Sequence, residues 1–227
     1  MTIAFQTKPL LGKGIYTVPD IAMILGIPYS KVNRWITSFW NDRFAISYGE
    51  SYSWKVDLTK AVNFHTLVEI YTFFQLSQAG VSSKNILIAH DILSKQLDTP
   101  YPFAKRDVIN QLRTDGQKVM IEQKDGSIYT IDAHMQFKLK IIKDFFKNLD
   151  FDSNAMATRF WPLGKGKSVV CDPHHQFGQP VINGTNIVAE VIADMVKAGD
   201  HVDFVARTYG LRKSQVEDAV EYTRKAA

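Results

Sequence analysis

The sequence predicts an α+β, mostly helical fold, and three observations carry that prediction. Two pairs of short amphipathic helices, each broken by a glycine-led turn, lie near the ends of the chain, over 17–36 and 203–222. Two stretches of alternating residues, interrupted by Gly49 and by Asp125-Gly126, indicate β-hairpins. Of the 227 residues, 45% are hydrophobic and 22% are charged, which is typical of a globular protein with a buried core.

The first helix pair has the start and stop signals of a helix-turn-helix, a unit that can place one helix in the DNA major groove. Thr17 is a good N-cap, and Pro19 suits the first helical turn. Gly26 then ends this helix. Ser30 is expected to cap the second helix, over 31–40.

A hairpin is expected directly after the second helix, which is the order of a winged helix-turn-helix. The expected elements are a strand over 44–48, a turn at Gly49-Glu50, a strand over 51–56, and a helix over 58–79 that Asp57 caps and Gly80 closes. Residues 1–80 are therefore predicted to be a winged helix-turn-helix DNA-binding domain with a long helix.

The middle region, 81–151, is predicted to be a helical connector with one β-hairpin. Its expected elements are a helix over 84–97, a short helix over 104–113, a hairpin over 118–132 and a helix over 135–148.

Residues 152–227 are predicted to form a small module of β-strands and a second helix-turn-helix. Its expected elements are short strands over 157–161, 168–171 and 179–184, a helix over 187–198, and the terminal helix pair over 203–222. Protein binding or dimerisation is favoured for the terminal pair over DNA binding. Glu217, Asp218 and Glu221 would repel phosphates there.

The second helix of the first pair carries side chains suited to reading bases. Asn33 and Arg34 can make bidentate contacts to adenine and guanine, while Lys31 and Tyr29 can reach phosphates. Residues 1–60 hold seven Lys/Arg against four Asp/Glu, an excess that favours a phosphate backbone. The candidate DNA-binding residues are Tyr29, Ser30, Lys31, Asn33, Arg34 and Thr37 on the helix and Ser51, Tyr52 and Lys55 on the hairpin.

The sequence offers no comparable constellation for catalysis, so we predict no enzyme activity, no cofactor and no metal. Gly164-Lys-Gly-Lys-Ser168 lacks the first glycine of a phosphate loop, since Trp161 stands there, and a strand is expected to follow it. Cys171-Asp-Pro-His-His175 offers metal-ligand atoms, but the chain has no second cysteine to complete a zinc site. A metal-dependent nuclease would need paired carboxylates, and the acidic residues of the middle region show no such spacing.

We expect the protein to be cytoplasmic. A lone cysteine cannot form an internal disulfide, the first residues do not form a secretory signal, and no apolar run approaches the ~20 residues of a membrane span. We therefore predict no membrane association.

The segment from Ser168 to Ile187 resembles the bacterial VapB-like antitoxin module. That family's pattern of Asp-Pro, Gly-x-Pro-Val-Ile-x-Gly-Thr-x-Ile, a helix, Ala-Gly and a helix-turn-helix matches this sequence from Asp172-Pro173 through Gly178, Gly184-Thr185 and Ala198-Gly199. The first 80 residues resemble a MerR-like winged helix-turn-helix.

The resemblance implies the antitoxin of a type II toxin–antitoxin system, which pairs with a PIN-type ribonuclease toxin and represses its own operon. Its partners would be double-stranded operator DNA, the toxin and a second copy of the chain, because such operators are usually inverted repeats. A PIN-type site is acidic, so Arg159, Lys165 and Lys167 are candidate toxin contacts. The alternative is a MerR-like regulator that senses a small molecule in a pocket between the aromatic middle helices.

Overall fold

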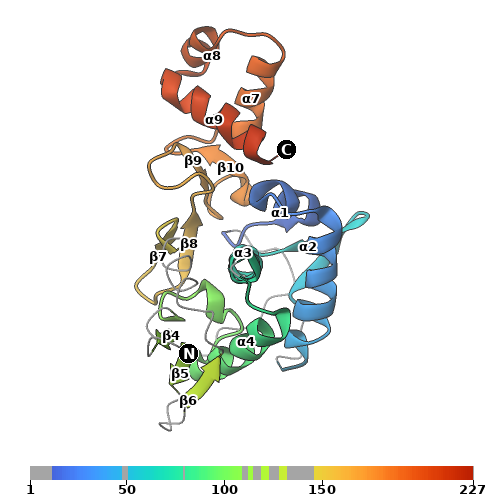
Figure 1. Cartoon of the computed structure of the whole chain (residues 1–227). Helices are drawn as coiled ribbons and strands as arrows, with labels where there is room; N and C mark the ends of the chain where they lie inside the picture. The colour runs from blue at the N-terminus through green and yellow to red at the C-terminus, as the bar shows by residue number, and fades with distance from the viewer. Residues whose placement is uncertain are drawn as a thin grey trace.

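The computed structural model describes residues 12–47, 51–78, 80–108, 112–114, 119–122, 128–131 and 146–226. These residues form a mixture of helices and small antiparallel sheets, which agrees with a fold containing both α and β structure. A body built around helices α1–α4 lies at one end of the molecule, and a module of helices α7–α9 stands beyond the sheet β7–β10 (Figure 1).

The first helix pair forms as its capping signals indicate. Strand β1 (Tyr16–Thr17) leads into α1 (Val18–Leu25), where Thr17 and Asp20 make a reciprocal capping box. Gly26, with φ of 62°, ends α1 in the left-handed conformation that glycine adopts without a steric penalty. Helix α2 (Tyr29–Trp35) follows and continues as a π-helical segment, η1 (Ile36–Asn41). Pro28, and not Ser30, is the N-cap of α2.

The hairpin lies further along the chain than the sequence predicts. The expected strand over 44–48 is wrong, because residues Phe44–Ser47 form a short 3-10 helix, η2. The hairpin pairs β2 (Ser53–Val56) with β3 (Thr59–Val62), so the expected start of the next helix at residue 58 is also wrong. Asp57 does not cap a helix; it lies in the hairpin turn with φ of 48°. Strand β1 joins β3 on its other side, which gives the order β1-β3-β2.

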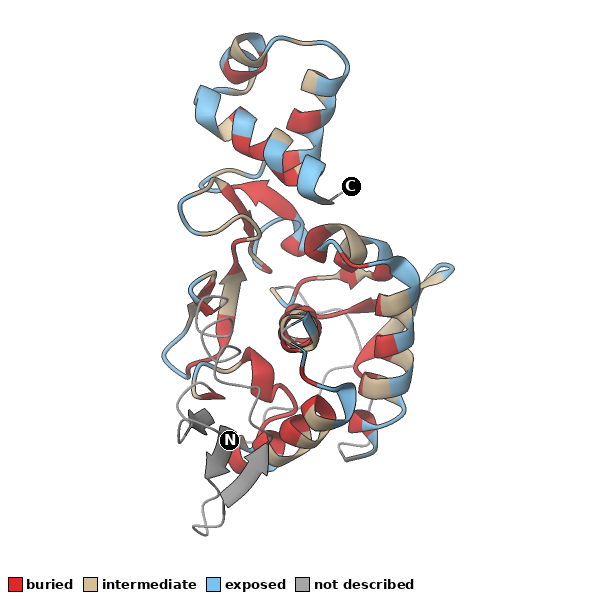
Figure 2. Ribbon diagram, viewed as in Figure 1, coloured by how far each residue is buried: buried red, intermediate tan, exposed pale blue. Residues whose placement is uncertain are grey.

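Helix α3 (Phe64–Gln78) runs through the middle of the body, with α4 (Ser83–Leu97) beside it (Figure 2). Ser82 caps α4, as predicted. Phe73 of α3 meets Trp35, Phe39 and Trp40, with ring centroids 4.9, 5.3 and 5.7 Å away, respectively. These contacts fix α2 and η1 against the core.

The main hydrophobic cluster takes in residues from Tyr16 to Val108 and also Phe146, Leu149, Phe160 and Cys171. It therefore crosses both predicted domain boundaries, at residues 80 and 151, and those boundaries stay predictions. A second cluster lies among α7, α8, α9, β9 and β10.

The middle region contains a short 3-10 helix, η3 (Pro102–Ala104), and a sheet of β4 (Leu112–Thr114), β5 (Val119–Glu122) and β6 (Ile128–Ile131). The strands β5 and β6 confirm the hairpin predicted over 118–132. The helix predicted over 104–113 is wrong at its end, where β4 begins. Of the helix predicted over 135–148, residues 135–145 lie outside the described residues.

The last part of the chain matches its predicted order. The four strands of its sheet are β7 (Leu149–Phe151), β8 (Ala157–Phe160), β9 (Val169–Cys171) and β10 (Pro180–Ile182), in the order β10-β9-β8-β7. Strand β7 was not predicted. The helices are α7 (Ala189–Lys197), α8 (Val202–Tyr209) and α9 (Lys213–Ala226), and Gly210 ends α8 in the left-handed conformation. None of the described helices combines the length and apolarity needed to cross a bilayer.

The N-terminal body contacts the last part of the chain at several places, and two of these contacts involve its first residues and helix α1. Helix α9 packs against α1. In addition, the Ile15 amide donates a hydrogen bond of 2.8 Å to the carbonyl oxygen of Phe177. Gly178 has φ of 91°, and a Cβ built there would collide with the Tyr16 hydroxyl, so the tyrosine ring occupies the space beside this glycine.

A buried ionisable pair links α3, α4 and η3. Glu69 Oε1 accepts hydrogen bonds from the amides of Phe103 at 2.6 Å and Ala104 at 3.2 Å, and Glu69 Oε2 lies 2.7 Å from His90 Nε2. Both side chains are at most 1% exposed. Burial raises the pKa of Glu69, and His90 and the two amides offset part of that rise.

Glu69→Ala is expected to lower the free energy of unfolding by about 3–5 kcal/mol, because it leaves His90 and two backbone donors buried without an acceptor. Glu69→Gln keeps one oxygen acceptor and should cost less. Urea denaturation measures both changes, with exposed Glu217→Ala as a control expected within about 0.5 kcal/mol of wild type. A loss below about 1 kcal/mol for Glu69→Ala would contradict this role for the carboxylate.

Candidate nucleic-acid interface

The exposed side of α2, together with η1 and the hairpin β2–β3, forms a continuous polar surface that we call the α2–hairpin face. Lys60 on β3 joins its two parts. The Lys60 ammonium donates to Asn33 Oδ1 at 3.0 Å and to Thr37 Oγ1 at 2.8 Å. The Thr37 hydroxyl in turn donates to the Asn33 carbonyl at 2.8 Å. The hairpin is therefore held at a fixed position beside the helix.

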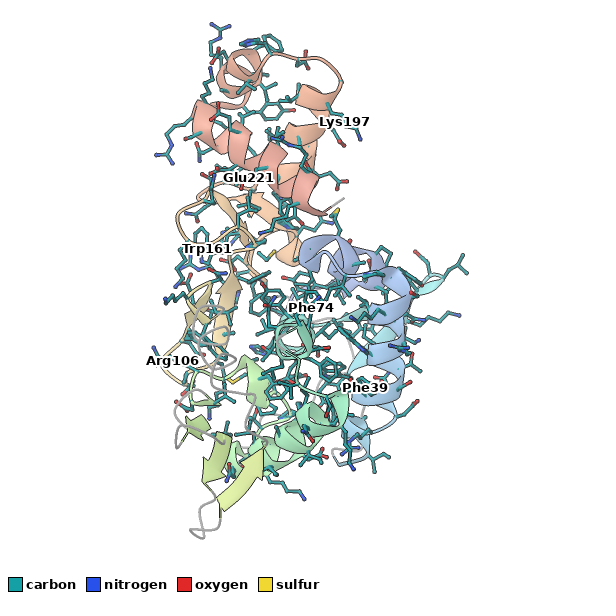
Figure 3. The ribbon with its side chains drawn as sticks, in the orientation of Figure 1. Phe39, Phe74, Arg106, Trp161, Lys197 and Glu221 are labelled. Atoms are coloured by element: carbon teal, nitrogen blue, oxygen red, sulfur yellow. The ribbon has the colours of Figure 1, made fainter. Side chains whose placement is uncertain are left out.

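The predicted residues of α2 differ in how available they are. Tyr29, Ser30 and Arg34 are exposed. Asn33 is half-buried, and its side-chain oxygen accepts a hydrogen bond from Lys60. The Lys31 ammonium lies 4.9 Å from the Trp35 ring centroid and 5.5 Å from that of Phe74, a residue of α3 labelled in Figure 3. Lys31, Asn33 and Arg34 therefore do not project together, and Arg34 is the one directed freely to solvent.

The predicted hairpin contacts are corrected in part. Tyr52 is only 1% exposed, and its hydroxyl donates to the Pro100 carbonyl at 2.8 Å, so the prediction that it contacts DNA is wrong. Tyr52 fills the core because the hairpin begins only at Ser53. Ser51 is half-buried and donates to Asn41 Oδ1 at 2.8 Å, which ties it to the end of η1.

Lys55 does lie on the hairpin surface, and the sequence did not point to two further residues of this face, Lys60 and Leu58. Lys55 is exposed on β2 and pairs in register with Lys60 on β3. Leu58, at the hairpin tip, is 99% exposed. The segment Thr59–Val62 does not alternate between polar and apolar residues, so no local signal identifies Lys60 as a strand residue that faces the helix.

The charge of this face favours an anionic partner. Arg34, Lys55 and Lys60 make no ion pair with any carboxylate in the part of the chain that the structure describes. Asp57 contributes one exposed carboxylate at the hairpin tip. Cations that lack internal partners are free to neutralise phosphates, whereas paired cations must first give up an ion pair.

The three candidate toxin contacts are all engaged within the chain. Arg159 Nε lies 3.1 Å and Lys165 Nζ 2.7 Å from the carboxylate of Asp150. Burial alone would raise the pKa of Asp150, but these cations and the Trp161 indole N–H lower it overall. The structure thus brings Arg159 and Lys165 together around one carboxylate, with about two fifths of each side chain still exposed.

Lys167 is directed to α9 instead. Its ammonium lies 3.0 Å from Asp218 and 2.7 Å from Glu221, the latter labelled on α9 in Figure 3. Asp218 also accepts a hydrogen bond from the Ser168 amide at 2.8 Å. The loop before β9 is therefore fastened to α9, and a strand follows it, as expected from the sequence.

The motifs set aside as catalytic or metal-binding carry no assembled site in the described residues. Cys171 is buried, and burial raises the pKa of its thiol, which keeps it protonated and unreactive at neutral pH. His174 and His175 are exposed, and no group of three or more His, Cys, Asp or Glu side chains that could hold a metal gathers within the described ranges.

A cavity of about 720 Å³ lies between the start of α3, the end of α4 and the turn before β8. Lys13, Lys105, Asp98 and Asp152 line it together with His65. His65 Nε2 donates to the Ala157 carbonyl at 3.1 Å, since a carbonyl can only accept. Burial, and then the charge of Lys13, lower the pKa of His65 to about 4, so its ring is neutral at pH 7.

The chain is similar in sequence and in fold to proteins of Mycobacterium tuberculosis. The family described as "Protein of unknown function (DUF433)" matches residues 169–223. The chain is 28% identical over 170 residues to "Putative antitoxin VapB45" of Mycobacterium tuberculosis, an alignment that covers 68% of each protein. The crystal structure of Rv2018 from the same organism shares the fold, with a TM-score of 0.65 and 19% identity over 90% of this chain and 96% of that one.

A further relative matches almost the whole sequence. "Uncharacterized protein Rv2308" of Mycobacterium tuberculosis is 37% identical over 232 residues, which cover 99% of this chain and 96% of that protein. The chain therefore belongs to the same family as Rv2308.

Proposed function

We propose that this chain is a DNA-binding antitoxin of a type II toxin–antitoxin system. It binds operator DNA through the α2–hairpin face, represses its own operon, and neutralises a PIN-type ribonuclease toxin. It acts by binding and not as an enzyme. The observation that carries the DNA-binding half is the Lys60 bridge, which holds a strand beside α2, while Arg34 and Lys55 form no ion pair with any of the described residues.

The docking follows from this arrangement. Helix α2 lies in the major groove and presents Ser30 and Arg34 to base edges, as the second helix of a helix-turn-helix does. The hairpin serves as the wing of a MerR-like winged helix-turn-helix, and Lys55 and Lys60 meet the adjacent phosphate backbone. Two copies of the chain read an inverted repeat as a homodimer.

The toxin half rests on the similarity to VapB45. The acidic, metal-binding site of a PIN-type ribonuclease attracts cations, and the half-exposed Arg159 and Lys165 are the candidates that meet it. Lys167 serves mainly to fasten its loop to α9.

Arg34→Ala is expected to weaken binding to a duplex from the promoter of the chain's own gene by about 1–3 kcal/mol, or roughly 5- to 150-fold, because it removes a bidentate base contact. Arg34→Lys should retain binding to unrelated DNA but lose discrimination, since a point charge replaces the planar fork. Fluorescence anisotropy at fixed salt measures both variants.

Lys197→Ala is the matched control, because it removes one exposed cation at the end of α7, remote from α2 (Figure 3). Equal affinities for wild type, Arg34→Ala and Lys197→Ala would exclude α2 as the reading helix.

The double variant Arg159→Glu/Lys165→Glu is expected to abolish rescue when the chain is co-expressed with a toxic ribonuclease encoded by the neighbouring reading frame, because two negative charges would face the toxin's acidic site. The control is the same double reversal at Arg207 and Lys197. Thermal melting of each variant checks that it is folded. Full rescue by Arg159→Glu/Lys165→Glu would assign toxin binding to another surface.

A second function is favoured by the cavity beside His65, namely that of a regulator that senses a small molecule. Lys13 and Lys105 line it together with Asp98 and Asp152, and this mixture of charges suits a small zwitterion such as an amino acid. The aromatic middle helices expected to form this pocket contribute Phe64 and Leu97 at their ends.

If the chain is such a sensor, one of the common amino acids at millimolar concentration should raise the melting temperature by about 2 °C or more and change DNA affinity. Met156→Trp, which narrows the cavity, should remove that shift. If no amino acid changes the melting temperature and the chain still neutralises the toxin, the sensor function is excluded and the antitoxin function is retained.

A further inference from the structure

The end of α9 lies on the turn that joins α1 to α2. A Cβ built at Gly26, the residue that ends α1, would lie 3.8 Å from the carbonyl oxygen of Lys225. Tyr222, one turn earlier on α9, is 2% exposed and lines a small pocket together with Asp20 and Ile24 of α1. The last turn of the C-terminal module is thus fixed relative to the first helix-turn-helix (Figure 1).

This last turn carries two exposed cations, Arg224 and Lys225. Neither is ion-paired with a carboxylate of the described residues. Two neighbouring carboxylates already have partners, because Glu221 binds Lys167 and Asp20 closes the capping box with Thr17. Glu190 lines the same pocket as Asp20 and Tyr222 and is a further carboxylate near this helix. The positive charge of this turn therefore stays available to an outside anion.

The two cations lie close to the start of α2. Gly26 precedes the first residue of α2, Tyr29, by three residues, a span of at most about 11 Å. Lys225 also lines a groove of about 320 Å³ together with Gly26 and Phe74, and the Lys31 ammonium lies over the Phe74 ring. Arg224 and Lys225 thus extend the positive charge of α2 beyond its first residue.

We propose that Arg224 and Lys225 form part of the DNA-binding surface and contact the phosphates that flank the start of α2. This inference rests on the proposed DNA binding by α2, whose first residues point to base edges when it occupies the major groove. The phosphate backbone on that side then passes the α1–α2 turn, where the end of α9 lies. The C-terminal module would thereby contribute affinity that does not depend on base sequence.

The other basic residues of the module do not share this position. Helix α8 and the connection from α8 to α9 lie on the side of the module away from α1 (Figure 1). Arg207 belongs to α8, Arg212 directly precedes α9, and both are exposed. They provide a control pair with the same change in net charge.

The test measures DNA binding by the full chain as a function of salt. Anisotropy is recorded between 50 and 200 mM KCl for the promoter duplex and for an unrelated duplex of equal length. Arg224→Ala/Lys225→Ala should weaken binding to both duplexes by about tenfold and reduce the slope of log K against log salt by about 1.8, the value for two lost phosphate contacts. Arg207→Ala/Arg212→Ala should leave the affinity and the slope close to wild type.

Each outcome separates this inference from the function on which it rests. If Arg34→Ala weakens promoter binding while Arg224→Ala/Lys225→Ala keeps the wild-type slope, the contact by α9 is excluded and DNA binding by α2 stands. If the Arg207/Arg212 pair lowers the slope as much as the Arg224/Lys225 pair does, the effect is one of net charge and the inference is also wrong. If wild type binds neither duplex, both proposals fail.

Discussion

A single carboxylate beneath the surface holds together the elements on which the α2–hairpin face is built. Glu69 of α3 receives two backbone amides from η3 and faces His90 of α4, and the ring of His90 stacks on Phe44 with centroids 3.7 Å apart. Phe44 belongs to the segment between η1 and the hairpin. The position of η2, the segment that follows η1, therefore depends on a polar contact in the core, where an unmatched donor or acceptor would be costly.

The sequence was sufficient wherever structure is decided by near neighbours. Thr17 and Gly26 mark the two ends of α1 through contacts within a few residues, and the Asp-Gly turn predicts β5 and β6 in the same way. The predicted secondary structure was wrong where contacts with residues far away in the sequence determine the local conformation. Residues 44–48 alternate like a strand, but the stacking of Phe44 on His90 favours a 3-10 turn. Thr59–Val62 became a strand because Tyr16–Thr17 pairs with it from across the chain.

The residues of the candidate site also divide into those that local sequence identifies and those that depend on distant contacts. Arg34 and Lys55 were identified from residue type, since exposed cations on a helix face and a hairpin need only local structure. Lys60 could not be found without knowing where β3 lies, and Tyr52 could not be excluded without knowing that the core extends to Pro100. Local sequence also could not reveal that Arg159, Lys165 and Lys167 already have acidic partners, two of which come from α9.

The close fit of Tyr16 against Gly178 restricts how the two halves of this protein can evolve. No residue with a side chain can stand at position 178 while the tyrosine remains, and a smaller residue at position 16 would open a hole at the joint. A side chain at position 178 therefore requires a change at position 16. Recombination that exchanges one half for that of a distant relative would break the match unless the incoming half carries the matching residue, which is tyrosine at position 16 or glycine at position 178.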